Sequence, residues 1–330
     1  MVKQQRTKRF GISVILCACI LRLSLEGIPG MLLQWMSEKI SNSFQIYSET
    51  GRNVRFSASS EEILDHVRES PQPWIPVEER LSFSSEDADL VEMDYDCALR
   101  PDLETLIRTP LDWDLTSGDP AVLILHTHAT ESYTKQGQDY AETAQYRTLD
   151  EDYNMLSVGE EVAEVLENHG ICVIHDREIH DYPSYNGSYV DSRKTVEALL
   201  EQYPSIRLVL DLHRDALEKN GTQIRPVMDA EDCARIMIVA GTNVSRQNHE
   251  NWQENLSLAL KLHIQMEKLY PGIMRPLNLR PQRFNQDLSP GALLVEIGAA
   301  GNTHDEALTA ARRLAEAVAS LAKGVNDPVD

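Results

Sequence analysis

From about residue 121 onward, short apolar runs alternate with longer stretches in which apolar residues recur at helical spacing. The apolar runs cover residues 121–126, 171–175, 206–213, 235–241 and 292–298. The amphipathic stretches cover residues 155–169, 192–202, 251–269 and 303–323. Strands that are apolar on both faces and alternate with helices are typical of a mostly parallel sheet covered on both sides. The pattern therefore predicts an α/β domain of three layers over residues 116–330.

The N-terminal part of the chain has a different character. Residues 1–36 begin with a basic cluster, and an apolar run follows it at residues 10–21. This order is typical of a signal anchor whose charged end stays in the cytoplasm, so we expect one membrane anchor with the catalytic domain outside the cytoplasmic membrane. Residues 37–115 are polar, rich in Ser and Glu, and lack long apolar periods. They predict a stalk or a small accessory region.

The net charge of the chain limits the classes of molecule that it can bind. The chain of 330 residues carries 52 acidic against 31 basic side chains, for a net charge of −21. A surface of this sign repels the phosphate backbone, so the composition argues against nucleic acid as a partner.

Polar side chains able to do chemistry stand where three of the predicted strands end. His126, His128 and Glu131 follow the first strand, and Glu296 lies near the end of the last. A middle strand ends in Asp211, His213 and Arg214. In open α/β sheets, ligands bind beyond the carboxyl ends of the strands, so we expect these side chains to meet in one cavity. Two imidazoles, a carboxylate ligand and a second, free carboxylate are the parts of a catalytic zinc site.

These segments resemble one family. HTHATESYT, NGSYVDSRKTV, DLHRDA, GTN and FNQDLSPGALLVEIGAAGNT, in this order, are similar to the stage II sporulation protein P family of cell-wall lytic enzymes. DLHRDA and LLVEIG also resemble, more distantly, segments of zinc-dependent N-acetylmuramoyl-L-alanine amidases. The resemblance implies an amidase-like fold and hydrolysis of the amide between N-acetylmuramic acid and L-alanine in peptidoglycan during spore engulfment. It also implies cleavage of peptide cross-links as an alternative activity, and stage II sporulation proteins D and M as partners.

The same resemblance assigns roles to single residues. It implies that His213 and His128 bind Zn²⁺, with His126 as a further or alternative ligand, and that Glu296 is the general base. Glu131 is the preferred carboxylate ligand. The sequence leaves open four other carboxylates in its place: Glu142, Asp150, Glu151 and Asp152.

Further residues are candidates for substrate contacts rather than for metal binding. Arg214 stands beside His213, where it could hold a peptide carboxylate through two parallel hydrogen bonds. Asn285, Gln286 and Asp287 lie in a loop before the last strand, where they could bind glycan or peptide. A non-catalytic wall-binding scaffold is the rival interpretation from a different class.

Overall fold

The computed structural model describes residues 81–134, 146–228, 231–245 and 248–326. The described residues belong to one compact unit, Glu78–Asp330. The predicted membrane anchor, residues 1–36, lies outside them, as does most of the predicted stalk. No helix among the described residues is both long and apolar enough to span a bilayer.

A seven-stranded sheet organises this unit, in the order β2-β9-β8-β10-β5-β3-β4. Its strands are β2 (Met93–Tyr95), β3 (Val122–Leu125), β4 (Val173–His175), β5 (Leu208–Asp215), β8 (Ile236–Gly241), β9 (Leu277–Arg280) and β10 (Ala292–Ala299). Neighbouring strands run parallel except at β8 and β10, which are antiparallel. The prediction of a mostly parallel α/β sheet is confirmed.

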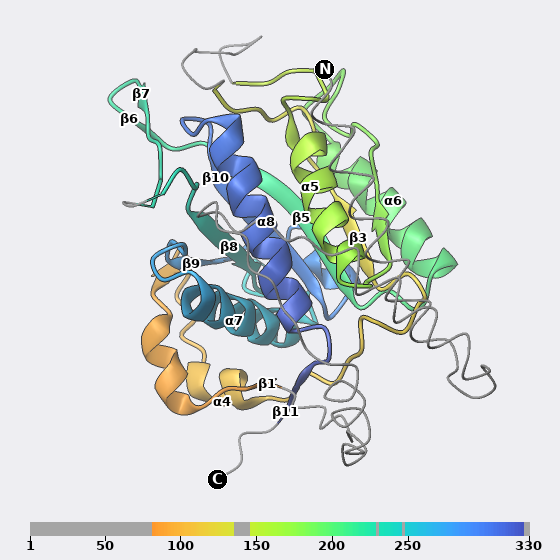
Figure 1. Cartoon of the computed structure of the whole chain (residues 1–330), viewed down its shortest axis with the longest axis vertical. Helices are drawn as coiled ribbons and strands as arrows, with labels where there is room; N and C mark the ends of the chain where they lie inside the picture. The colour runs from red at the N-terminus through yellow and green to blue at the C-terminus, as the bar shows by residue number, and fades with distance from the viewer. Residues whose placement is uncertain (1–80, 135–145, 229–230, 246–247, 327–330) are drawn as a thin grey trace, which may run out of the picture. The chain divides into compact units, whose positions relative to one another are not determined.

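Helices cover the two faces of the sheet unequally. The helices α5 (Met155–Asn168), α7 (Trp252–Leu269) and α8 (His304–Ser320) lie over one face and enclose the main hydrophobic core (Figure 1). The helix α6 (Ser188–Gln202) covers part of the other face, where Val196 packs with residues of β3 and β5. Successive side chains of a strand point to opposite faces, so Val209, Asp211 and His213 of β5 all face the α6 side.

The predicted boundary near residue 115 falls inside the unit. The strand β2 is the edge of the main sheet, and the short helix α4 (Leu103–Arg108) buries Leu106 and Ile107 in the same core as α7. Before these elements lie the strand β1 (Leu81–Ser82), which pairs with β11 (Val325–Asn326), and the 3-10 helix η1 (Ser85–Leu90). These elements are too short to give a clear apolar period, which is why the sequence pattern does not reveal them.

Two further elements lie in the connections of the sheet. A hairpin of β6 (Glu218–Lys219) and β7 (Thr222–Gln223) follows β5. The 3-10 helix η2 (Gln286–Leu288) precedes β10. In the loop that contains η2, Phe284 packs over Met237, Val239 and Leu294, so this loop covers part of the α6-side face where no helix does.

Candidate active site

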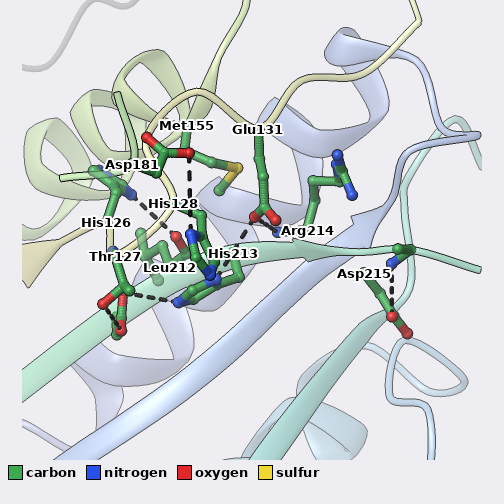
Figure 2. A network of polar contacts seen from close by, with 12 residues as sticks. His126, Thr127, His128, Glu131, Met155, Asp181, Leu212, His213, Arg214 and Asp215 are labelled. Atoms are coloured by element: carbon green, nitrogen blue, oxygen red, sulfur yellow. Dashed lines mark hydrogen bonds and ion pairs between the residues drawn. The ribbon is translucent and has the colours of Figure 1, made fainter. Parts of the chain in front are cut away.

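Three elements place the predicted site residues on the α6 side of the sheet. In the register of the sheet, Glu296 of β10 stands directly beside His213 of β5. The loop that follows β3 brings His128 and Glu131 to the same place. Figure 2 shows His128, Glu131 and His213 close together at the end of the strands. The convergence expected from the sequence is therefore present for these four side chains.

His128 is enclosed by aromatic rings. Its ring stacks on Tyr185 at a centroid distance of 4.5 Å and meets the His213 ring edge-on at 5.3 Å. Its Nδ1 lies 3.3 Å from the Ser188 hydroxyl. Burial lowers the pKa of His128 to about 4 against the pull of Glu131, so the imidazole is neutral at physiological pH. A neutral imidazole is the form that ligates metal ions.

Glu131 is a buried carboxylate held by cations and backbone. Its Oε2 lies 3.6 Å from His213 Nδ1 and accepts a hydrogen bond from the Arg214 backbone N–H at 3.2 Å. Its Oε1 accepts from Arg147 at 3.2 Å. Burial alone would raise the pKa of Glu131, but the charges of Arg214 and His213 lower it to about 2. The group is therefore ionised at neutral pH.

His213 lies between two carboxylates. Its Nε2 is 2.9 Å from Asp211 Oδ1, an ion pair when the imidazole is protonated. Burial acts to lower the pKa of His213, whereas Asp211 and Glu131 raise it well above its ordinary value. Asp211 also accepts from the backbone N–H and the hydroxyl of Thr127, which fixes its orientation.

Glu296 is partly buried, and one oxygen of its carboxyl group is enclosed by the protein. Among the described residues its Oε2 has no hydrogen-bond partner. Burial raises its pKa to about 8, with the charge of His213 acting against this shift. A carboxyl group that titrates near neutral pH is suited to accept and return a proton.

His126 lies apart from this group. Its Nδ1 is 3.1 Å from the Leu212 carbonyl oxygen, and its Nε2 is 2.9 Å from Nε2 of His175. The ring lies against Gly159 of α5, on the far side of the sheet from His128. Burial lowers the pKa of His126 to about 3. Because both ring nitrogens already have partners there, the structure does not bring His126 to the other expected ligands.

The predicted substrate-binding residues are engaged within the protein. Arg214 donates from its guanidinium to the carbonyl oxygens of Ser132 and Tyr146, so it anchors a loop instead of facing a ligand. The Asn285 amide donates to the Tyr189 carbonyl oxygen. The other two side chains of that loop hold it to the sheet and to α6: Gln286 bonds Gly241 and Val239, and Asp287 accepts two hydrogen bonds from Arg193 at 3.0 Å each.

Of the carboxylates that the sequence left open, Glu131 is the one beside His213. Asp150, Glu151 and Asp152 are exposed, and Glu151 pairs with Arg177. Glu142 lies outside the described residues. Glu131 is therefore the carboxylate that the described structure offers to the site.

Sequence reasoning missed a second layer around Glu131 and His128. Arg147 bridges Glu131 to Asp181, at 3.2 Å and 2.5 Å, and its guanidinium lies 4.7 Å from the centre of the Tyr185 ring. Asp181 in turn accepts from the hydroxyl of Thr130 at 2.6 Å. No periodicity or motif marks Arg147 or Asp181, because their role follows from contacts between loops that are distant in sequence.

The donor set fits a zinc ion in kind. The imidazoles of His128 and His213 and the ionised carboxylate of Glu131 are the donor types that zinc takes in catalytic sites. His213 can bind a metal ion only after it loses the proton that Asp211 and Glu131 stabilise on it. Within the described ranges, however, no three His, Cys, Asp or Glu side chains are already spaced as a group that could hold a metal ion. The residue types support a metal site, and their present spacing does not complete one.

The described residues thus define an α/β protein with a buried His–Glu–His–Glu site on one face of its sheet. The chain belongs to the stage II sporulation protein P (SpoIIP) family, whose sequence model matches residues 35–319. Stage II sporulation protein P of Bacillus subtilis (strain 168) is 30% identical over 220 residues, which are 62% of this chain and 52% of that protein. The aligned region therefore spans about half the length of this relative.

Solved structures of amidases are also similar. N-acetylmuramoyl-L-alanine amidase AmiC2 of Nostoc punctiforme shares 13% identity, with a TM-score of 0.36, and the match covers 61% of this chain and 94% of that one. An N-acetylmuramoyl-L-alanine amidase of Clostridium difficile 630 shares 16% identity, with a TM-score of 0.37 and coverage of 62% and 97%.

Proposed function

We propose that this protein is a zinc-dependent N-acetylmuramoyl-L-alanine amidase that remodels peptidoglycan during sporulation. The proposal includes an N-terminal membrane anchor, an extracytoplasmic catalytic domain, and stage II sporulation proteins D and M as partners. The observation that carries it is the grouping of His128, Glu131 and His213 around a neighbouring carboxyl group, Glu296, that has a buried free oxygen.

In this proposal His128, Glu131 and His213 hold the metal ion. Zinc, when bound, supplies polarisation of the scissile carbonyl and a more acidic water molecule. Glu296 would accept a proton from the attacking water and return it to the departing L-alanine nitrogen. The rings of Tyr185 and Tyr189, both within contact of His128, form a wall that limits access of bulk water.

The test replaces Glu296 by Gln, which keeps the size of the side chain and removes its ability to carry a proton. We expect the release of stem peptides from purified sacculi to fall by about 10²- to 10⁴-fold, because general base catalysis contributes on this order. Mass spectrometry of the digest measures it. Free stem peptides indicate amidase action, whereas split cross-linked dimers without free stems would assign an endopeptidase.

Zinc content is a second readout, independent of turnover. We expect the full chain to purify with close to one zinc ion per molecule, and both His128→Ala and His213→Ala to lose it, whereas Glu296→Gln retains it. Elemental analysis measures this content. A wall-binding scaffold would keep its sacculus affinity and show neither the activity nor the metal dependence.

A further inference from the structure

An arginine that pairs with Asp215 of β5 carries a buried donor that no protein atom among the described residues uses. Buried side-chain atoms without a hydrogen-bond partner in the described residues include His213 Nε2, Glu296 Oε2 and Arg275 Nη1. The first two belong to the site described above. Buried polar groups are almost always hydrogen-bonded, so an unpartnered guanidinium nitrogen next to a catalytic centre calls for a ligand.

The sheet register places the backbone of Arg275 beside β8, with that strand between it and Glu296 of β10. Met237 of β8 pairs with Glu296, Ile236 pairs with Ile297, and the Arg275 backbone N–H donates to the Ile236 carbonyl oxygen at 2.7 Å. The backbone of Arg275 therefore lies beyond the beginning of β8, on the side away from β10.

The side chain of Arg275 reaches back across the sheet. Its Nη2 is 2.7 Å from Oδ2 of Asp215, the residue two positions after His213 on β5. Because β8 and β10 lie between β9 and β5, the side chain of Arg275 crosses β10 near Ala299, which pairs with Asp215 three positions beyond Glu296.

In the pair of Arg275 and Asp215, the group that can still form a hydrogen bond is a donor of Arg275. Asp215 uses Oδ2 for Arg275, and its Oδ1 accepts from the Ala216 backbone N–H at 2.7 Å. The Arg275 side chain is 13% exposed, and its Nη1 remains free to bond an acceptor. Hydrogen bonds from a guanidinium to a carboxylate are roughly twice as strong as neutral ones, so a carboxylate oxygen is the preferred acceptor.

We propose that Arg275, held by Asp215, binds the carboxylate that follows L-alanine in the stem peptide and so determines which peptide is accepted. The inference rests on the proposed amidase function. There, Glu296 passes its proton to the departing nitrogen, so the peptide attached to that nitrogen begins next to Glu296. The guanidinium of Arg275 lies at Asp215, two positions beyond His213 on β5, at the end of the strands past which that peptide would extend. The carboxylate contact first expected of Arg214 is thereby assigned to Arg275.

Binding to a protein that cannot turn over its ligand tests this assignment. The Glu296→Gln chain is titrated by calorimetry with N-acetylmuramoyl-L-alanyl-D-glutamate and with the same compound amidated at the glutamate α-carboxyl group. We expect the free acid to bind about 10-fold more tightly than the amide. Adding Arg275→Gln should reduce this ratio to about one, mainly by weakening the binding of the acid.

Two further variants separate ligand recognition from folding. Arg280→Gln removes another arginine that pairs with a carboxylate, Asp96, near the end of β9, and it should leave the ratio unchanged. Arg275→Lys keeps a cation beside Asp215 but removes the planar fork, so it should fold and show an intermediate ratio. If Arg275→Gln fails to fold, as judged by thermal unfolding, the Lys variant decides the question.

The outcomes distinguish the two proposals. A ratio that stays near 10 in a folded Arg275 variant overturns the carboxylate subsite, as does an equal loss of affinity for both compounds. Binding of both compounds without discrimination by the parent protein overturns the subsite and leaves the amidase proposal standing. Failure to bind either compound overturns both.

Discussion

At the residue scale, the site depends on which partner each buried polar side chain finds. His126 and His128 are two positions apart, and burial lowers the pKa of both. The two ring nitrogens of His126 contact a carbonyl oxygen and His175. The ring of His128, by contrast, contacts His213 and the exposed Tyr185. Two neighbouring histidines with similar pKa values therefore have different functional prospects.

A substitution of Gly159 tests how tightly the protein encloses the pair of His126 and His175. A glycine-to-alanine change inside an exposed helix usually stabilises by about 1 kcal/mol. Here a Cβ would lie 2.5 Å from Nε2 of both histidines, so we expect Gly159→Ala to lower the free energy of unfolding by about 1–3 kcal/mol through overpacking. Urea denaturation measures the change. Stabilisation by the variant would show that the pair can move aside at little cost.

At the element scale, buried polar side chains fasten helices and loops to one another. Lys261 and Ser257 of α7 both donate to the Leu106 carbonyl oxygen, at 3.0 Å and 2.8 Å, which satisfies one of the unpaired carbonyl groups at the end of α4. The pair of Arg193 and Asp287 joins α6 to the loop before β10 in a similar way. Such contacts hold in place the elements that carry the site.

Lys261 gives a pH-dependent test of this helix contact. Burial lowers its pKa from 10.5 to about 8, so between pH 8 and 10.5 the unfolded chain binds more protons at this position than the folded chain. Stability contributed by Lys261 therefore rises with pH over this window, by about 3 kcal/mol at most. We expect the stability difference between Lys261→Met and the parent protein to shift by that amount in favour of the parent. Urea midpoints at pH 7, 9 and 10.5 measure it.

The comparison with the variant removes the contribution of other groups that titrate at high pH. A stability difference that stays constant from pH 7 to 10.5 would mean that Lys261 keeps an ordinary pKa in the folded protein. Ser257 still donates to Leu106 in the variant, so the carbonyl group is not left without a partner.

At the scale of the whole unit, the segment before residue 116 completes the sheet and the core. The strand β2 pairs with β9, and Trp113 donates from its indole nitrogen to the Leu321 carbonyl oxygen at the end of α8. Segments close to the beginning and the end of the unit are thereby joined. The folded unit that carries the candidate site therefore begins earlier than its apolar pattern indicates.

A matched pair of truncations tests this boundary. We expect residues 78–330 to unfold in one cooperative thermal transition. A chain of residues 116–330 should lose that transition and aggregate, because it leaves the edge of β9 unpaired and exposes the surface of α7 that α4 covers. Calorimetry and light scattering measure the two properties. Equal stability of the two chains would place the boundary at residue 116 after all.

The sequence by itself determined the elements with a strong period and the residues at the strand ends. The predicted helix 155–169 is α5, the predicted strand 292–298 lies in β10, and the predicted helix 303–323 is α8, which a capping box at Thr303 begins. His128, Glu131, His213 and Glu296 were named from strand-end chemistry and family motifs. This was possible because apolar periodicity and the end of a parallel strand are local properties of the chain.

Tertiary structure alone decided the partners of these residues. The strand β3 ends at Leu125, so the alternation of side chains along a strand does not predict where His126 and His128 point. The packing of the loop decides that these two side chains point to different sides of the sheet. The guanidinium of Arg214 donates to two backbone carbonyl oxygens, and Arg275 pairs with Asp215 on the far side of two strands. The physical reason is that hydrogen-bond partners of buried charges are set by distances between segments remote in sequence, which no local pattern records.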